Sequence, residues 1–282
     1  MPYNSCLSEA KRVVDAVLES YFKSPVDIFG KGHHEGETNY LKFLRASYIR
    51  TVSDVLTFFS NRRASLLEIG SYLGVVSIAL QELGYCIHSC DIPEFHNAPR
   101  LRAVYERRKI PYSGINLRSA SLPYPDESFD GVIMCEVIEH LNFNPIPPLL
   151  EINRTIKPEG LLYLGTPNLV KLTNRVRFLL GRSIHHPIRE FLSQLDPEDN
   201  MIVGLHWREY SSDELRELLE ITGYKVIHRS FHVYADERRQ TPIKKILGSL
   251  IYLYPPFRPF QCVVSQKTSR PQYKFWLTEA NQ

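Results

Sequence analysis

Short apolar runs alternate with amphipathic stretches through the middle of the chain. The strand-like runs are residues 65–69, 85–90, 112–118, 129–135 and 161–165, of which 112–118 is the weakest. The helix-like stretches between them are residues 73–83, 98–108 and 146–156. A turn at residues 157–160 (KPEG) separates the last of these helices from its strand. Strands that alternate with helices in this way favour a parallel, doubly wound sheet.

The flanks of this region show longer helices and a break in the pattern. Residues 8–22 and 40–59 have apolar side chains at helical spacing, and we expect these two helices to cover one edge of the sheet. After Asn168 the alternation stops, and only residues 171–180 suggest a helix before Trp207.

A clear helical pattern then begins at Ser211 or Ser212, either of which can cap it, and ends at Gly223. Its apolar face consists of Leu215, Leu218 and Leu219. The runs 224–231 and 261–264 predict the last two strands.

Residues 66–91, LLEIGSYLGVVSIALQELGYCIHSCD, read as strand, glycine turn, helix, strand and acid. Gly70 and Gly74 permit the sharp turn and leave room for a ligand to approach the backbone. Asp91 follows Gly70 by 91 − 70 = 21 positions, where an acid accepts hydrogen bonds from ribose hydroxyls. The pattern indicates a nucleotide-cofactor site. The nicotinamide fingerprint G-x-G-x-x-G lacks its middle glycine here, and a tight turn of another α/β domain is the remaining alternative.

Composition narrows the possible classes of protein further. The 282 residues, 43% hydrophobic and 23% charged, suit one large α/β domain with additions. A net charge of +3 gives no reason to expect nucleic-acid binding. Five cysteines without a C-x-x-C pair fit reduced thiols. No signal peptide is evident at the start, and no run of ~18 apolar residues occurs. We therefore expect a cytoplasmic protein without a transmembrane segment.

Three further segments, together with residues 66–91, make the chain resemble a class I S-adenosylmethionine-dependent methyltransferase. LPYPDESFDGVIMCEVIEHL (122–141) is similar to the fourth-strand signature of that family. IKPEGLLYLGTPN (156–168) is similar to its fifth strand, and HWREYSSDELRELLEITGYKVI (206–227) to its late helix and sixth strand. The resemblance implies an α/β, Rossmann-like, doubly wound and mostly parallel seven-stranded sheet. N-terminal helices and a helical and loop insert after strand 5 would complete it.

This fold divides the chain into an N-terminal helical cover and a core interrupted by a lid. The expected parts are the cover (1–62), the cofactor-binding core (63–169), an acceptor-binding lid insert (170–208), the C-terminal part of the core sheet (209–268) and a tail (269–282).

The resemblance also implies roles for matching positions. Glu68 and Gly70 would border the methionine end of S-adenosylmethionine, and Asp91 would bind its ribose. The full set of expected cofactor contacts is Glu68, Gly70, Ser71, Tyr72, Gly74, Asp91, Ile92, Ser119, Ala120, Ser121, Leu122, Cys135, Glu136 and Val137. Ile92 and the segment 119–122 would lie at the adenine, although an acid often found in that segment is absent. Tyr72 stands where the family frequently has a glycine.

His140 and His206 are the candidate catalytic bases, because an oxygen nucleophile must lose its proton and histidine titrates near neutral pH. A structural role is the alternative for each: His140 as a cap or loop anchor, His206 as a tie between insert and core. The adjacent pair His185-His186 suggests solvated loop residues. Glu136, Glu139 and His140 form an E-x-x-E-H cluster similar to one that holds a divalent ion in some quinone-pathway O-methyltransferases of the family. We nevertheless expect no metal.

The sequence says least about the acceptor of the methyl group. Residues 171–189 contain five basic side chains and no acid, at Lys171, Arg175, Arg177, Arg182 and Arg189. This favours an anionic acceptor such as a nucleotide-linked sugar, a phospholipid-like carrier or a carboxylate; a solvated helix face is the alternative. Residues 244–254, apolar with a basic start, either touch a membrane surface weakly or pack on the core or a partner subunit.

The sequence thus predicts an enzyme that methylates a small molecule, by O-methylation in a glycan or natural-product pathway. One alternative is a nicotinamide-dependent oxidoreductase, against which the missing glycine and the segment CEVIEHL speak. The other is a non-catalytic cofactor-binding or assembly protein with the same fold. The oligomeric state stays open.

Overall fold

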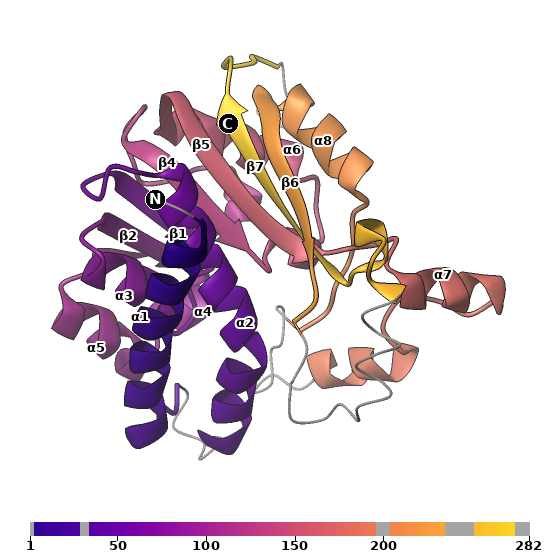
Figure 1. Ribbon diagram of the computed structural model, residues 1–282, viewed down its shortest axis with the longest axis horizontal. Coiled ribbons are helices and arrows are strands. Elements are labelled where there is room, and N and C mark those ends of the chain that lie inside the picture. Colours follow the sequence, from indigo (N-terminus) through magenta and orange to yellow (C-terminus); the bar gives the residue numbers. More distant parts are fainter. Residues whose placement is uncertain (1–2, 29–33, 196–203, 235–250, 274–282) are drawn as a thin grey trace.

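A computed structural model describes residues 3–28, 34–195, 204–234 and 251–273 of the chain (Figure 1). Its centre is one seven-stranded sheet with the order β3-β2-β1-β4-β5-β7-β6. The strands are β1 (Ser65–Ile69), β2 (Cys86–Asp91), β3 (Tyr112–Gly114), β4 (Phe129–Cys135), β5 (Ile156–Pro167), β6 (Tyr224–His232) and β7 (Phe260–Lys267). Strands β1 to β5 pair in parallel, and β7 lies antiparallel between β5 and β6. The predicted doubly wound, mostly parallel sheet is confirmed.

Helices cover both faces of this sheet. The α-helices are α1 (Tyr3–Lys23), α2 (His34–Phe58), α3 (Val75–Glu82), α4 (Pro93–His96), α5 (Pro99–Arg108), α6 (Ile146–Thr155), α7 (Leu172–Leu179) and α8 (Ser212–Ile221). Short 3-10 turns are η1 (Leu117–Ser119), η2 (Ile138–His140), η3 (Ile188–Leu195) and η5 (Pro255–Phe257). No helix in the described ranges has both the length and the apolar character needed to span a membrane.

Two apolar layers form because successive side chains of a strand point to opposite faces. Leu66 and Ile133 lie in the layer beneath α1, α2, α3 and α5, whereas Leu67 and Val132 lie in the layer beneath α6 and α8. The N-terminal helices therefore pack over a face of the sheet, and the prediction that they cover an edge is wrong. Apolar residues of α1 and α2 share one cluster with Ile133 of β4 and Tyr163 of β5, and the Tyr163 hydroxyl donates to Asp54 Oδ2 of α2 at 3.0 Å.

Two local predictions are also corrected. The KPEG stretch belongs to β5 and does not separate it from α6: Ile156 already pairs with Phe129, the register shifts before Gly131 pairs with Leu161, and Glu159 has φ +62°. This register shift between β4 and β5 accommodates the turn-forming residues within the strand. The predicted strand 112–118 ends at Gly114, because Asn116 accepts a hydrogen bond from the Arg118 N–H and starts η1.

Candidate active site

The glycine loop after β1 lies at the carboxyl end of the parallel strands, where such sheets bind ligands. Gly70 has φ +75° and its N–H donates to the Cys90 carbonyl oxygen at 2.9 Å. A Cβ at Gly70 would lie 2.3 Å from Val137 Cγ2, so the site requires glycine for space as well as for backbone conformation. Gly74, with φ +69°, closes the loop through a hydrogen bond from its N–H to the Ser71 carbonyl oxygen at 2.7 Å.

Tyr72 has the backbone conformation of a glycine, with φ +45°. Its N–H donates to Asp91 Oδ2 at 2.7 Å, and its ring meets those of Tyr40 and Phe95 with centroids 5.6 and 5.2 Å apart. These contacts hold a side chain in a conformation that is unfavourable for it. The loop therefore keeps the turn although tyrosine replaces the glycine that the resemblance leads one to expect.

Tyr105 of α5 braces the same loop and was not found from the sequence. Its hydroxyl lies 2.8 Å from both Ser71 Oγ and the Tyr72 carbonyl oxygen. In the sequence Tyr105 is one apolar position of a basic helix, and nothing there indicates a link to a loop more than 30 positions earlier.

Asp91 ends β2 beside the loop and is buried. Its carboxylate accepts hydrogen bonds from the backbone N–H groups of Tyr72 and Ile92, the latter at 2.8 Å. Burial raises the pKa of Asp91 to about 6, against the effect of these two hydrogen bonds. Each oxygen keeps a lone pair, so the carboxylate remains able to accept from the hydroxyls of a ribose.

Three further carboxyl groups lie near the ends of β1 and β4; those of Glu68 and Glu139 are buried, and that of Glu136 is half-buried. Glu68 accepts a hydrogen bond from Ser77 Oγ, and burial raises its pKa to about 8. Burial raises the pKa of Glu136 to about 7. Burial and the negative charge of Glu136 raise the pKa of Glu139 well above its usual range, although Glu139 accepts from Thr166 Oγ1 at 2.9 Å.

None of these four acids forms an ion pair within the part of the chain that the structure describes. A positively charged ligand among them would favour their ionised forms. S-adenosylmethionine carries a sulfonium and an ammonium group, so the donor set fits the cofactor that the sequence resemblance implies.

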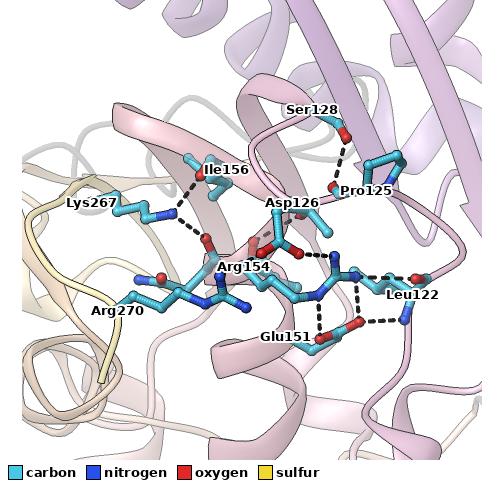
Figure 2. A network of polar contacts seen from close by, with 12 residues as sticks. Leu122, Pro125, Asp126, Ser128, Glu151, Arg154, Ile156, Lys267 and Arg270 are labelled. Carbon is cyan, nitrogen blue, oxygen red and sulfur yellow. Dashed lines mark hydrogen bonds and ion pairs between the residues drawn. The ribbon is translucent and has the colours of Figure 1, made fainter. Parts of the chain in front are cut away.

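The segment 119–122, expected at the adenine, is fixed from α6. Glu151 accepts a hydrogen bond from the Leu122 N–H at 2.7 Å, and Arg154 donates to the Leu122 carbonyl oxygen at 3.2 Å (Figure 2). Arg154 also pairs with Asp126 and Glu151, each at 2.7 Å. Leu122 is buried, whereas Ser119 and Ser121 are exposed. The contacts from α6 thus fix the segment at Leu122, and Ser119 and Ser121 remain accessible to a ligand.

Backbone strain is concentrated at the expected cofactor contacts. Among the described residues, six non-glycine residues have positive φ, and three of them are Tyr72, Ala120 and Glu136. Such conformations persist where the surroundings enforce them and cluster at functional sites. Cys135, just before Glu136, lies with Sγ 3.7 Å from Thr51 Oγ1 on α2, and Val137 packs on Gly70.

The two candidate bases lie side by side. The rings of His140, in η2, and His206 have centroids 4.9 Å apart. His140 Nδ1 lies 3.1 Å from the Leu205 carbonyl oxygen, and His206 Nδ1 lies 3.3 Å from Glu209 Oε1. Both partners can only accept hydrogen bonds, so in the neutral form each Nδ1 carries the hydrogen and each Nε2 is the free acceptor.

Glu209 connects His206 to the start of α7. It accepts hydrogen bonds from Lys171 Nζ at 3.2 Å and from Asn174 Nδ2 at 3.1 Å. Burial opposes ionisation, yet the bond from His206 and the charge of Lys171 lower the pKa of Glu209 to about 2. Glu209 is therefore a permanent carboxylate. Glu209 was not predicted from the sequence, although its position three residues after a candidate histidine was a signal.

The environments of the histidines differ. Burial, together with His206, lowers the pKa of His140 to about 4, so His140 is neutral at pH 7. His186 also reaches the group, with its ring 5.4 Å from that of His206 and its Nδ1 beside Glu190. His185 is exposed, as the sequence suggests for both, but His186 is partly buried in the site.

Within the described ranges, two groups of side chains have donor atoms close enough together to hold a metal ion. The donor atoms of Glu139, His140 and His206 lie within 4.8 Å of one another, as do those of Asp54, His232 and Cys262. The second group is a poorer cation site, because the Arg50 guanidinium donates to Asp54 at 2.9 Å.

The apolar segment 244–254, predicted to touch a membrane or to pack on the core or a partner subunit, is described only in part. Residues 244–250 lie outside the described residues.

Comparisons with known proteins show the family to which the chain belongs. A family model described as a methyltransferase domain matches residues 40–229. A probable S-adenosylmethionine-dependent methyltransferase of Mycolicibacterium smegmatis is 33% identical over 126 residues, which cover 45% of this chain and 38% of that protein. The chain thus matches little more than a third of the length of this curated relative. A ubiquinone biosynthesis O-methyltransferase of Dinoroseobacter shibae is 24% identical over 69% of this chain and 73% of its own.

Solved structures show the same fold. Magnesium protoporphyrin IX methyltransferase from Synechocystis, with bound SAH, is 16% identical with a TM-score of 0.53, over 90% of this chain and all of that one. A possible histamine N-methyltransferase from Thermotoga maritima is 18% identical with a TM-score of 0.52, over 86% of this chain and 99% of its own.

Proposed function

We propose, on the premise that the chain belongs to the methyltransferase-domain family matched by residues 40–229, that it transfers a methyl group to an oxygen atom of a small-molecule acceptor. The seven-stranded sheet is that of a class I methyltransferase, and the relative from Mycolicibacterium smegmatis is described as a probable S-adenosylmethionine-dependent methyltransferase. The family match disfavours the nicotinamide alternative. The relative from Dinoroseobacter shibae supports oxygen as the methylated atom.

The observation that carries the proposal is the pair of His206 and Glu209 beside the buried carboxyl groups. Because Nδ1 of His206 is held by Glu209 Oε1, Nε2 is the atom that can accept a proton. S-adenosylmethionine supplies a methyl group already activated by its positive sulfur. His206 Nε2 would take the proton of the acceptor hydroxyl as that oxygen accepts the methyl group, and the cofactor would leave as the neutral thioether. The carboxylate of Glu209 stabilises the imidazolium that results.

The remaining residues hold the reactants in place. Asp91 would bind the ribose, and Glu68, Glu136 and Glu139 would face the positive end of the cofactor. His140, neutral at pH 7, would add no charge that repels the imidazolium of His206. The acceptor's place in a glycan or natural-product pathway, and its anionic character, remain predictions from the sequence.

Labelled S-adenosylmethionine incubated with fractionated extract of the source organism tests the proposal. We expect an extract component to gain a base-stable methyl ether, identified by mass analysis. His206→Gln should lose transfer while it still binds the cofactor. Glu217→Gln, an exposed change on α8, should leave transfer unchanged. Cofactor binding without any labelled acceptor would favour the non-catalytic alternative.

A further inference from the structure

An apolar surface lies open to solvent beside the candidate active site. Leu179 at the end of α7 and Ile188 at the start of η3 are 86% and 81% exposed. Phe178, Leu180, Leu192 and Leu253 are exposed by more than half. We refer to these six side chains as the lid surface. Exposed apolar groups of this number mark a site of contact with a membrane or another molecule.

The lid surface is drawn from segments that are distant in sequence but joined in space. The Arg175 guanidinium of α7 lies over the Phe257 ring, 5.4 Å from its centroid, which connects α7 to residues 251–257. In η3, Phe191 meets Trp207 with ring centroids 5.8 Å apart. Figure 1 shows α7 projecting from the body of the protein, with η3 and the segment 251–257 before β7 on the same side. None of the six side chains belongs to either apolar layer of the sheet.

Positive charge surrounds the lid surface. Residues 170–192 contain five basic residues and one acid, Glu190, giving 5 − 1 = +4. The whole chain has a net charge of +3, so the remainder amounts to 3 − 4 = −1. The acids that follow, Asp196, Glu198 and Asp199, lie outside the described residues. Within the described part of this segment, four basic side chains are exposed: Arg175, Arg177, Arg182 and Arg189.

We propose that the lid surface docks on an anionic lipid surface. Exposed leucine, isoleucine and phenylalanine side chains with arginines around them are the composition of elements that lie in the headgroup region of a membrane. Arginines attract anionic headgroups, and the apolar side chains enter the acyl boundary. A second copy of the chain is a poorer occupant, because two segments of charge +4 would repel one another.

The position of the lid surface also indicates the kind of acceptor, an inference that rests on the proposed function. Lys171 and Asn174, at the base of α7, hold Glu209 and through it His206. Docking through α7 would place the candidate base next to the lipid boundary. The fitting acceptor is then an amphiphile that stays in the membrane while its polar head is methylated.

Vesicle sedimentation tests the docking without any turnover, so its outcome is independent of the proposed function. The full chain should bind vesicles of phosphatidylglycerol and phosphatidylcholine, bind pure phosphatidylcholine much more weakly, and be released by salt. Arg182→Ser with Arg189→Ser should weaken binding about 30-fold, at ~1 kcal/mol for each cation. Leu179→Glu with Ile188→Glu should weaken it by at least about tenfold.

The matched control removes the same charge elsewhere. Arg102→Ser with Arg107→Ser, exposed positions on α5, should keep most of the binding. Thermal melting and cofactor affinity of every variant should equal those of the unmodified chain. The proposal is overturned by equal binding to both vesicle types, by no binding, or by an α5 variant as weak as the lid variant. It is also overturned if the chain dimerises without lipid and Leu179→Glu abolishes the dimer.

Discussion

Replacing Glu209 by Gln removes one negative charge and almost no volume, and it probes the candidate base through its partner. The Glu209 carboxylate accepts from His206, Lys171 and Asn174 at 3.1 to 3.4 Å, and its side chain is 13% exposed. A glutamine amide provides only one oxygen and turns an NH2 group toward one of these donors. Lys171, 20% exposed, loses its counterion. We expect the change to leave the fold intact and to affect the reaction strongly.

The magnitude follows from the charge that forms on His206. With Nδ1 3.3 Å from Oε1, the charge centres of an imidazolium and the carboxylate are about 4–5 Å apart. At an effective dielectric constant of about 20 this attraction is roughly 3–4 kcal/mol, which solvent reduces because His206 is 28% exposed. The transition state should lose about 1.5–3.5 kcal/mol, so kcat should fall about 10- to 300-fold.

The assay is the initial rate of S-adenosylhomocysteine formation with the labelled acceptor fraction, at saturating cofactor. We expect kcat to fall and the KM for the cofactor to stay nearly constant, because Glu209 acts on the base. Glu209→Asp should recover part of the rate, and Glu217→Gln should match the unmodified enzyme. A Glu209→Gln enzyme with unchanged kcat would refute the role of His206 as the base.

Three further changes test other parts of the structure. Asp91→Asn should weaken S-adenosylmethionine binding about 10- to 100-fold by calorimetry, because a charged acceptor of ribose and backbone hydrogen bonds is lost; unchanged affinity would place the ribose elsewhere. Glu68 has a pKa raised to about 8 from 4.5, so its neutral form stabilises the cofactor-free fold fully below about pH 4.5, and this contribution is lost as pH rises toward 8. In urea titrations the unfolding free energy of the unmodified chain should therefore fall across that window by up to ~1.4 kcal/mol per pH unit, and this fall should be absent in Glu68→Gln. Parallel curves of unfolding free energy against pH for the two proteins would disprove the burial argument. Ser211→Ala breaks the capping box of α8 and should cost about 1 kcal/mol, seen as a Tm lower by roughly 2–4 °C, whereas an equal loss in Ser212→Ala would argue against Ser211 as the cap.

The order of elements could be predicted because the period of apolar residues differs between strands and helices. The predicted strand 129–135 coincides with β4, and the helix for which either Ser211 or Ser212 can serve as the cap is α8, with Ser211 as its cap. Boundaries failed where tertiary pairing overrode local preference. Lys157 to Gly160 have turn-forming side chains, yet pairing beside β4 extends β5 through them. The N-terminal helices were placed at an edge because periodicity reveals an apolar stripe but not which surface that stripe meets.

Some contacts of the candidate site could likewise be predicted from the sequence, and others could not. Gly70 and Asp91 follow strands, and parallel strands bring their carboxyl ends together, so their proximity follows from the topology. The contact of Tyr105 with Ser71 and the reach of His186 toward His206 depend on how α5 and the insert pack. No spacing in the sequence encodes such contacts. The positive φ of Tyr72 shows how a residue outside the family pattern is accommodated.

The most direct test of the account is a calorimetric titration of the full chain with S-adenosylhomocysteine and S-adenosylmethionine near neutral pH. The account expects saturable binding of one cofactor per chain, with protons released as Glu68 and Glu136 ionise around the positive sulfonium, so that affinity for S-adenosylmethionine rises from pH 6 to 8. A folded chain that gives no heat with either compound at millimolar concentration would contradict the cofactor site on which the account rests.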